Sequence, residues 1–380
     1  MQNPVTATIL GIVAELSAFG RLKSRRFECL WIKQGIKQFH AVPSARLGSI
    51  RPPRRSTSLV LIFASVWLVL GCGGPQSTLD PAGRGAEQIA ELFWWLVAVS
   101  ILIWLLVVGL AVYAGWIRPG VHHYRKANLL IIGGGAVFPT LALAVYLSYG
   151  LALMPGLLAP APEDSLKITV SGEQWWWRVR YHPPSGEPIE LANEIRLPVG
   201  EPVDLFLASP DVIHSFWIPS LTGKMDMVPG RVNRLTLEAT KTGVYHGVCA
   251  EYCGTAHALM KFHVVVMEPE AFAAWLEHQA RPASRPKKMA ARGQELFLIH
   301  GCSACHTVRG LPANGRVGPD LTHVGSRVSL GAGILPNDPT AFLRWVAHTE
   351  ELKPGVHMPE FGMLPKEDLQ ALAIFLEGLE

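Results

Sequence analysis

The sequence predicts a multidomain membrane protein with a two-helix transmembrane hairpin, an all-β Greek-key barrel and a small all-α domain. Only 17% of the 380 residues are charged and 49% are hydrophobic, whereas a soluble domain normally carries about 25% charged residues. Two long runs are apolar and uncharged, and a stretch of alternating apolar and polar residues follows them. The length suits two or three domains. The apolar fraction excludes a disordered chain.

Residues 1–71 are predicted to be a basic N-terminal extension that ends in a signal peptide. Residues 1–58 contain ten Lys or Arg and only two Glu. The next twelve residues, 59–70, are apolar and uncharged, which is too short for a membrane span and typical of a signal peptide. The junction Gly71-Cys72 resembles a bacterial lipoprotein signal, which would make Cys72 the lipidated residue. An uncleaved anchor is the alternative.

The basic excess of this extension precedes a hydrophobic run instead of lying on a folded domain. Nucleic-acid binding needs the positive charge on the folded surface. We therefore expect no nucleic acid among the partners.

Residues 72–160 are predicted to form the transmembrane hairpin. Two uncharged runs, 92–116 and 129–153, give helices long enough to cross a hydrocarbon core of about 30 Å. The loop 117–128 between them has three basic residues and no acidic one, so it should face the cytoplasm. Both flanks of the hairpin would then lie on the periplasmic or outer side of a bacterial inner membrane. A buried core hairpin is the alternative.

Residues 161–280 are predicted to form the β domain. Apolar residues alternate with polar ones in several short runs, such as 166–170 and 262–266, and Pro and Gly separate these runs. This pattern is typical of an antiparallel sandwich or barrel. A short helix starting at Pro269 leads into a proline-rich basic linker, 281–288.

A cluster of possible metal ligands lies in residues 249–260, which read Cys-Ala-Glu-Tyr-Cys-Gly-Thr-Ala-His-Ala-Leu-Met. Thiols with imidazoles suit copper, zinc or iron-sulfur centres. A structural zinc site would use two Cys and two His, but it has no use for Met260. A mononuclear blue-copper site needs only one Cys. Two cysteines on one loop can also place two sulfurs between two copper ions.

The pattern Cys, any residue, Glu, any residue, Cys, Gly, then His and Met resembles the binuclear copper (CuA) loop of subunit II of haem-copper oxidases. The resemblance extends over about residues 90–280 and implies a cupredoxin-like fold for the β domain. It implies a ligand set with bridging Cys249 and Cys253, terminal His214 and His257, an axial Met260 and an axial Glu251 carbonyl. It also implies a magnesium ion at the side chain of Glu251, where subunit I makes contact.

Two further features concern electrons and protons. Trp175 begins the run Trp175-Trp176-Trp177, which resembles the family's aromatic cluster, and the resemblance makes it the residue at which electrons enter. A core position is the alternative. The family often has a carboxylate for a proton channel seven residues before the proline of the second helix. This chain has Ile132 there, before Pro139, so a proton-channel role is not expected.

Residues 289–380 contain the sequence Cys302-Ser-Ala-Cys305-His306, which is the motif for covalent attachment of haem c. A redox dithiol is the alternative. The motif, a preceding helical segment and a final amphipathic helix resemble a class I cytochrome c. The resemblance implies that His306 and Met358 are the axial ligands of the iron and that the Pro319 carbonyl orients the His306 ring. Met363 and His357 compete with Met358 for the sixth position.

Together these features resemble subunit II of the cytochrome-c-fused class of terminal oxidases. The resemblance implies an oxidoreductase subunit without catalytic residues of its own, which accepts electrons at haem c and passes them through CuA to haem in subunit I. Subunit I, on a separate chain, would reduce oxygen and pump protons in aerobic respiration. Subunit I, subunit III, a cytochrome c or another respiratory donor, and membrane lipid are the expected partners. The alternatives are a subunit of a CuA-containing nitric oxide reductase and a stand-alone membrane-tethered redox carrier.

Overall fold

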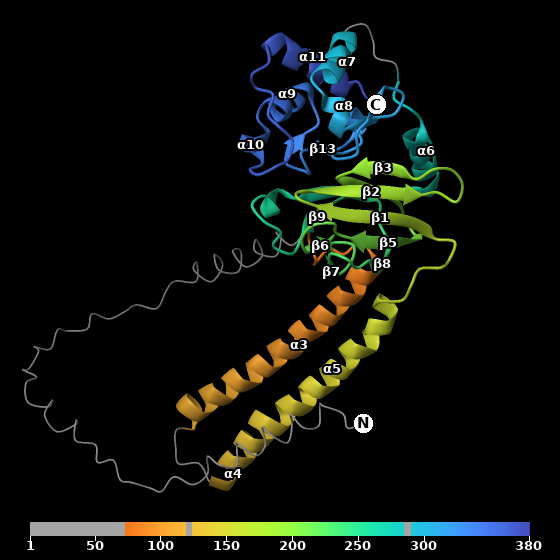
Figure 1. Ribbon diagram of the computed structural model, residues 1–380. Helices are drawn as coiled ribbons and strands as arrows, with labels where there is room; N and C mark the ends of the chain where they lie inside the picture. The colour runs from red at the N-terminus through yellow and green to blue at the C-terminus, as the bar shows by residue number, and fades with distance from the viewer. Residues whose placement is uncertain (1–72, 119–123, 285–289) are drawn as a thin grey trace, which may run out of the picture. The chain divides into compact units, whose positions relative to one another are not determined.

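The computed structural model describes residues 73–118, 124–284 and 290–380 (Figure 1). The described residues all belong to one compact unit of the chain. The signal-peptide segment and the expected lipidation site Cys72 lie outside the described residues, as do residues 285–288 of the expected linker.

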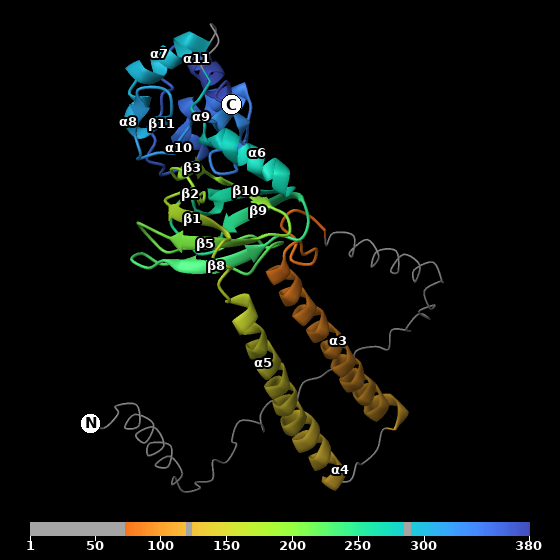
Figure 2. The same ribbon diagram turned by 90° about the vertical axis from the view of Figure 1, so that its right-hand side faces the viewer.

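Two long apolar helices follow the N-terminal segment (Figure 2). The first consists of α3 (Arg84–Val112) and the π-helical turn η2 (Tyr113–Ile117), and the second of α4 (Tyr124–Leu129), the π-helical η3 (Leu130–Val137) and α5 (Phe138–Leu157). Their candidate spans have mean hydropathies of 2.8 and 2.0. The apolar side chains along both helices are mostly exposed, as expected for surfaces that contact lipid.

The β domain consists of two five-stranded sheets. The first has the order β3 (Ile189–Ala192), β2 (Trp176–His182), β1 (Leu166–Glu173), β5 (Pro202–Ala208) and β8 (Asn233–Glu238). The second has the order β4 (Glu194–Pro198), β10 (Lys261–Met267), β9 (Gly243–Cys249), β6 (His214–Trp217) and β7 (Met225–Met227). The sequence predicted antiparallel pairing, but β1 pairs with β5 and β4 pairs with β10 in parallel. The reason is that the chain crosses to the other sheet between the two strands of each pair: β4 lies between β1 and β5 in sequence, and β5 and β8 lie between β4 and β10.

An aromatic cluster fills the space between the sheets. The Trp177 ring lies 4.9 Å from the Phe262 ring and 5.8 Å from the Phe216 ring, centroid to centroid. Phe216 pairs with Cys249 across β6 and β9. This packing fixes the start of β6 and the end of β9 side by side, which brings the expected ligands on the two strands together.

The C-terminal domain is mainly helical. Its helices are α7 (Ala291–Ile299), α8 (Cys302–Cys305), α9 (Pro339–Ala347), α10 (Thr349–Leu352) and α11 (Lys366–Glu377). Two short hairpins, β11 (Thr307–Val308) with β12 (Ala313–Asn314) and β13 (Ser329–Leu330) with β14 (Leu335–Pro336), connect them. The helix α6 (Pro269–Ala280) precedes this domain and packs its Phe272 against Tyr181 of the β domain. The fold class predicted from the sequence is confirmed.

Candidate metal and cofactor sites

The sulfur and nitrogen ligands predicted on β6 and the β9–β10 loop form one buried cluster. The ligand atoms of His214, Cys249 and Cys253 all lie within 4.8 Å of one another. The two Sγ atoms are 3.8 Å apart, and Nδ1 of His214 is 3.8 Å from Sγ of Cys249. Two sulfurs thus lie side by side, with an imidazole directed at the first.

Three other expected ligands complete the cluster. Nδ1 of His257 lies 3.5 Å and Sδ of Met260 lies 3.8 Å from Sγ of Cys253. The carbonyl oxygen of Glu251 lies 3.1 Å from Sγ of Cys249. Each sulfur therefore has an imidazole nitrogen and one weaker donor close to it. This donor set fits a pair of copper ions better than one zinc ion, because a single tetrahedral ion would leave two donors unused.

The ring of His214 is held in place by Asp211. Oδ1 of Asp211 lies 2.9 Å from Nε2 of His214, and Oδ2 accepts a hydrogen bond of 2.7 Å from the Gln174 amide. Burial alone would raise the pKa of Asp211, but hydrogen bonds from the Val212 amide and the His214 ring outweigh burial and lower it. The carboxylate therefore stays ionised and leaves Nδ1 of His214 free to face Cys249.

The two thiols influence each other's protonation. The hydrogen-bonded contact with the Cys253 side chain lowers the pKa of Cys249 to about 3. The same contact, together with burial, raises the pKa of Cys253, because a second thiolate would lie beside the first. A metal cation at this position would remove the repulsion and hold both sulfurs as thiolates.

Trp175 lies directly against the cluster of possible metal ligands. Its side chain is only 8% exposed, and Nε1 donates a 3.0 Å hydrogen bond to the Cys253 carbonyl. Gln174 donates to the same carbonyl through Nε2 at 2.7 Å. On the other side, a Cβ atom on Gly355 would lie 3.0 Å from Cη2 of Trp175. The indole is thus enclosed between the loop that carries Cys253 and the loop that carries Met358.

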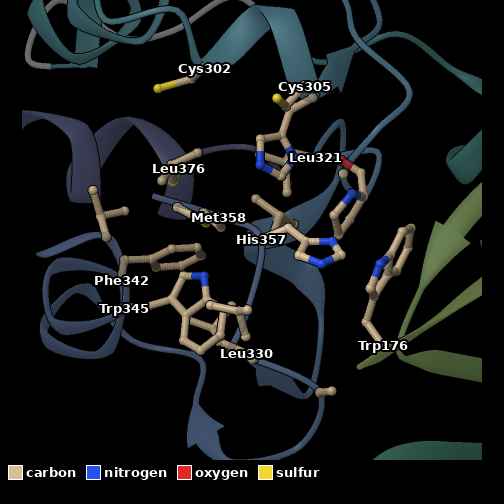
Figure 3. Close-up of a pocket in the computed structure, with 18 of the residues that line it drawn as sticks. Trp176, Cys302, Cys305, Leu321, Leu330, Phe342, Trp345, His357, Met358 and Leu376 are labelled. Atoms are coloured by element: carbon tan, nitrogen blue, oxygen red, sulfur yellow. Dashed lines mark hydrogen bonds between the residues drawn. The ribbon is translucent and has the colours of Figure 1, made fainter. Parts of the chain in front are cut away.

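The C-terminal domain contains a largely apolar cleft lined by Cys302, Cys305, His306 and Met358 (Figure 3). Apolar side chains from α7, α9 and α11 also line it, including Phe297, Phe342, Val346, Leu372 and Leu376. Figure 3 shows Met358 between Leu376 and the His357 ring, with Cys302 and Cys305 at the edge of the view. The cleft thus combines two free thiols, an imidazole and a thioether.

The orientation of His306 is set by its surroundings. Its Nδ1 lies 2.8 Å from the Pro319 carbonyl oxygen, which leaves Nε2 free for a metal. Burial lowers the pKa of His306, so the ring is neutral, as an iron ligand must be. A Cβ atom on Gly318 would lie 2.6 Å from Cε1 of His306. Only glycine lets the chain pass this close to the ring.

Of the two candidate methionines, only Met358 lines the cleft, while Met363 is 77% exposed. The Met358 carbonyl accepts a 3.0 Å hydrogen bond from Oγ1 of Thr349. His357 also lines the cleft. The residues of the cleft fit a covalently bound haem, because two thiols, one neutral imidazole and one thioether face an apolar space.

Two basic residues of the cleft were not predicted from the sequence. Lys353 and Arg327 both line the cleft. Neither belongs to a ligand motif, and a lysine or arginine in a loop is most often exposed. Only the folded structure reveals that they are directed inward.

The comparisons with known proteins agree with this geometry. The family model for the periplasmic domain of cytochrome c oxidase subunit II matches residues 184–268, and the cytochrome c model matches residues 290–380. Cytochrome c oxidase subunit 2 of Alkalihalophilus pseudofirmus is 32% identical over 342 residues, which cover 86% of this chain and 97% of that protein. The Bacillus subtilis protein of the same name is 30% identical over 352 residues, which cover 85% of this chain and 97% of that protein.

These family models imply copper and haem, and the relatives are subunits of a haem-copper oxidase, which is an oxidoreductase complex. The two apolar helices agree with a membrane-anchored subunit, and the relatives and family models support a role in the electron transfer of an oxidase. The chain therefore belongs to the cytochrome c oxidase subunit 2 family and carries a cytochrome c domain at its C-terminal end.

Proposed function

We propose that this chain accepts electrons at a covalent haem c, relays them through a binuclear CuA centre and delivers them to haem in subunit I. The observation that carries the proposal is the pair of sulfurs 3.8 Å apart, each with an imidazole nitrogen within 3.8 Å. Subunit I, on a separate chain, reduces oxygen and pumps protons. We assign the copper domain to residues 161–280 and the cytochrome domain to residues 289–380, as the sequence predicts.

The copper site is suited to electron transfer because its donors are rigid and complete. A sulfur-bridged copper pair supplies one-electron chemistry in which the charge change is shared by two ions. Cys249 and Cys253 would bridge the ions, with His214, His257, Met260 and the Glu251 carbonyl as the remaining ligands. The side chains of His214, Cys249, Cys253 and Met260 are buried, and strand pairing to Phe216 of the aromatic core holds Cys249, so these ligands would move little when charge changes.

In the cytochrome domain, Cys302 and Cys305 would bind the haem covalently, and His306 and Met358 would be the axial ligands. The Pro319 carbonyl keeps Nε2 of His306 directed away from its own loop. The apolar walls of the cleft exclude water from the group it holds. Thioether ligation favours reduced iron.

Trp175 is proposed as the contact through which electrons pass from the cytochrome domain to copper. Its indole is hydrogen bonded to the Cys253 carbonyl and covered by Gly355. An external donor cannot reach this ring in the intact chain, because the side chain is buried. A soluble or membrane-bound cytochrome c, or another respiratory donor, would therefore react at the cytochrome domain.

The rest of the proposal concerns the membrane and the partners. The hairpin would span a bacterial inner membrane, with the copper and cytochrome domains on the periplasmic or outer side, and a lipid on Cys72 would add an anchor. Subunit I would contact the copper domain, and subunit III would complete the complex. The exposed Glu251 side chain would bind magnesium at the contact with subunit I.

Metal analysis of the purified chain tests the proposal. We expect two copper ions and one covalent haem for each chain. In a Cys249→Ser variant, the shared-valence copper signal should disappear while the haem spectrum stays intact, because the two sites share no ligand. One zinc ion for each chain, with no copper spectrum after copper loading, would rule out the CuA centre.

A further inference from the structure

The charges that line the haem cleft are unbalanced. Two of the lining side chains, Lys353 and Arg327, are cationic, and the described residues that line the cleft include no Asp or Glu. Apolar residues make up most of the remaining lining. Buried charges require an opposite charge or a metal, so the group that occupies this cleft should itself carry negative charge.

Lys353 is the more completely buried of the two cations, with only 2% of its surface exposed. Its Nζ donates a 2.9 Å hydrogen bond to the Gly331 carbonyl, and no carboxylate lies within ion-pair distance of it among the described residues. Burial lowers the pKa of Lys353 to about 7, although the nearby Cys253 opposes this effect. A carbonyl oxygen alone compensates an ammonium group poorly. A carboxylate beside Nζ would keep the group charged.

Arg327 is the second cation, and its residue is half-buried. Its guanidinium donates to the Asp320 carbonyl. Burial lowers its pKa, and the nearby carboxylates of Asp320 and Glu194 oppose this effect, so Arg327 is better compensated than Lys353. The chain thus places two cations, each bonded to a carbonyl, in one apolar cleft. A haem c has two carboxylates, one for each of these two cations.

We propose that Lys353 binds one carboxylate of the haem, which rests on the proposed haem site, and that Arg327 is available for the other. The position of Lys353 gives this contact a second consequence. Its acceptor Gly331 precedes Ala332, whose carbonyl accepts a 3.0 Å hydrogen bond from the Lys261 amide of β10. The ammonium group therefore lies on the side of the cleft that faces the copper domain. A positive charge there stabilises the haem after it gains an electron.

The experiment compares four full-length chains: wild type, Lys353→Met, Lys353→Arg and the control Lys366→Met, whose lysine is exposed and does not line the cleft. Resonance Raman spectra report the bending mode of the haem carboxylates, and redox titration reports the haem potential. Lys353→Met should shift the Raman band and weaken haem reduction by about tenfold, which corresponds to about 59 mV for one electron. Lys353→Arg should retain most of the wild-type potential, and Lys366→Met should match wild type.

The wild-type protein provides a test that needs no substitution. If Lys353 is paired with a carboxylate, the haem potential should show no step near pH 7. A potential that falls as the pH rises through 7, in a step that Lys353→Met removes, would overturn the proposal, because an unpaired amine would be losing its proton. An unchanged Raman band and potential in Lys353→Met would also overturn it. Failure of the wild-type chain to bind haem covalently would instead refute the haem site itself.

Discussion

Both candidate cofactor sites depend on a hydrogen bond to one nitrogen of an imidazole ring. Asp211 contacts Nε2 of His214, and the Pro319 carbonyl contacts Nδ1 of His306. In each ring, the other nitrogen is left free and faces sulfur donors or the haem cleft. Such partners commonly change metal affinity by about 10–100-fold. The chain thus sets the direction of each ligand through residues that would not themselves touch the metal.

Met358 and Met363 offer a matched test of the sixth iron ligand. Met358→Ala should lower the haem potential by about 59 mV or more, a tenfold change in the reduction equilibrium, because the thioether that favours reduced iron is lost. Met363→Ala should have no effect, since its side chain is 77% exposed. Redox titration with spectroscopic detection measures both variants. The copper spectrum should stay normal in each, and a lower potential in Met363→Ala alone would reverse the assignment.

The secondary structure elements place the sites through packing between distant segments. The Cys-x-x-x-Cys spacing is local, so the sequence alone predicts a two-sulfur loop. His214 reaches this loop because Phe216 pairs with Cys249 across β6 and β9. The sequence predicted no such pairing, and the resemblance to a family implied only that His214 is a ligand. Nothing in the sequence predicted that the indole of Trp175 lies beneath Gly355, or that Lys353 is directed into the cleft, because both depend on how separate loops pack.

The close approach of Gly355 to Trp175 can be tested with a matched glycine. Gly355 has φ +81° and Gly230 has φ +79°, but a Cβ atom on Gly230 meets nothing within 4 Å. Alanine at either position should therefore cost about 1–2 kcal/mol for its left-handed backbone. Only Gly355→Ala should also displace the loop from the indole and slow electron transfer from haem to copper severalfold. Flash-photolysis kinetics of the two variants would measure this difference, and equal rates would contradict the contact.

We expect a pair of histidines on β9 and β10 to make the contact with β13 sensitive to pH. The rings of His246 and His263 lie 4.7 Å apart, and Nδ1 of His263 is 3.0 Å from Oγ of Ser329. Burial lowers the pKa of His263, the neighbouring His246 adds to this effect, and Glu194 opposes it. Burial and the charge of Lys261 lower the pKa of His246.

Because the folded pKa of His263 is below its unfolded value of about 6.5, the unfolded chain binds more protons in the interval between them. Stability should therefore be lost as the pH falls from about 6.5 through the folded pKa. We expect faster hydrogen exchange at the amides of β13 at pH 5.5 than at pH 7 when rates are corrected for intrinsic chemistry. His263→Gln should reduce this dependence. The same acceleration in that variant would assign the effect to other groups.

At the scale of the whole chain, the last turn of α6, directly before the predicted linker 281–288, is bonded to the cytochrome domain. Arg309 of the cytochrome domain donates to the Gln279 carbonyl at 2.7 Å and to the Ala280 carbonyl at 3.1 Å, both in the last turn of α6. A cation at the C-terminal end of a helix is also favoured by the helix dipole. Arg178 donates to the Arg316 carbonyl at 3.0 Å. These bonds join the cytochrome domain to the copper domain, so the proposed electron transfer would not need a search by a mobile tether.

The last prediction is that the cytochrome domain both supplies electrons and shields Trp175 from outside donors. Stopped-flow reduction by a soluble cytochrome c would follow the copper band in the intact chain, in a chain ending at Gln279, and in a full-length Cys302→Ser/Cys305→Ser chain that has no covalent haem.

We expect copper to be reduced fastest in the intact chain. The truncated chain should be slower but measurable, because its indole is uncovered, and Trp175→Phe should slow it further. The full-length chain without haem should be slowest, since its cytochrome domain still covers the indole but cannot carry an electron. Equal rates in the intact and truncated chains would contradict an obligatory haem relay, and fast reduction of the full-length chain without haem would show that donors reach copper by another surface.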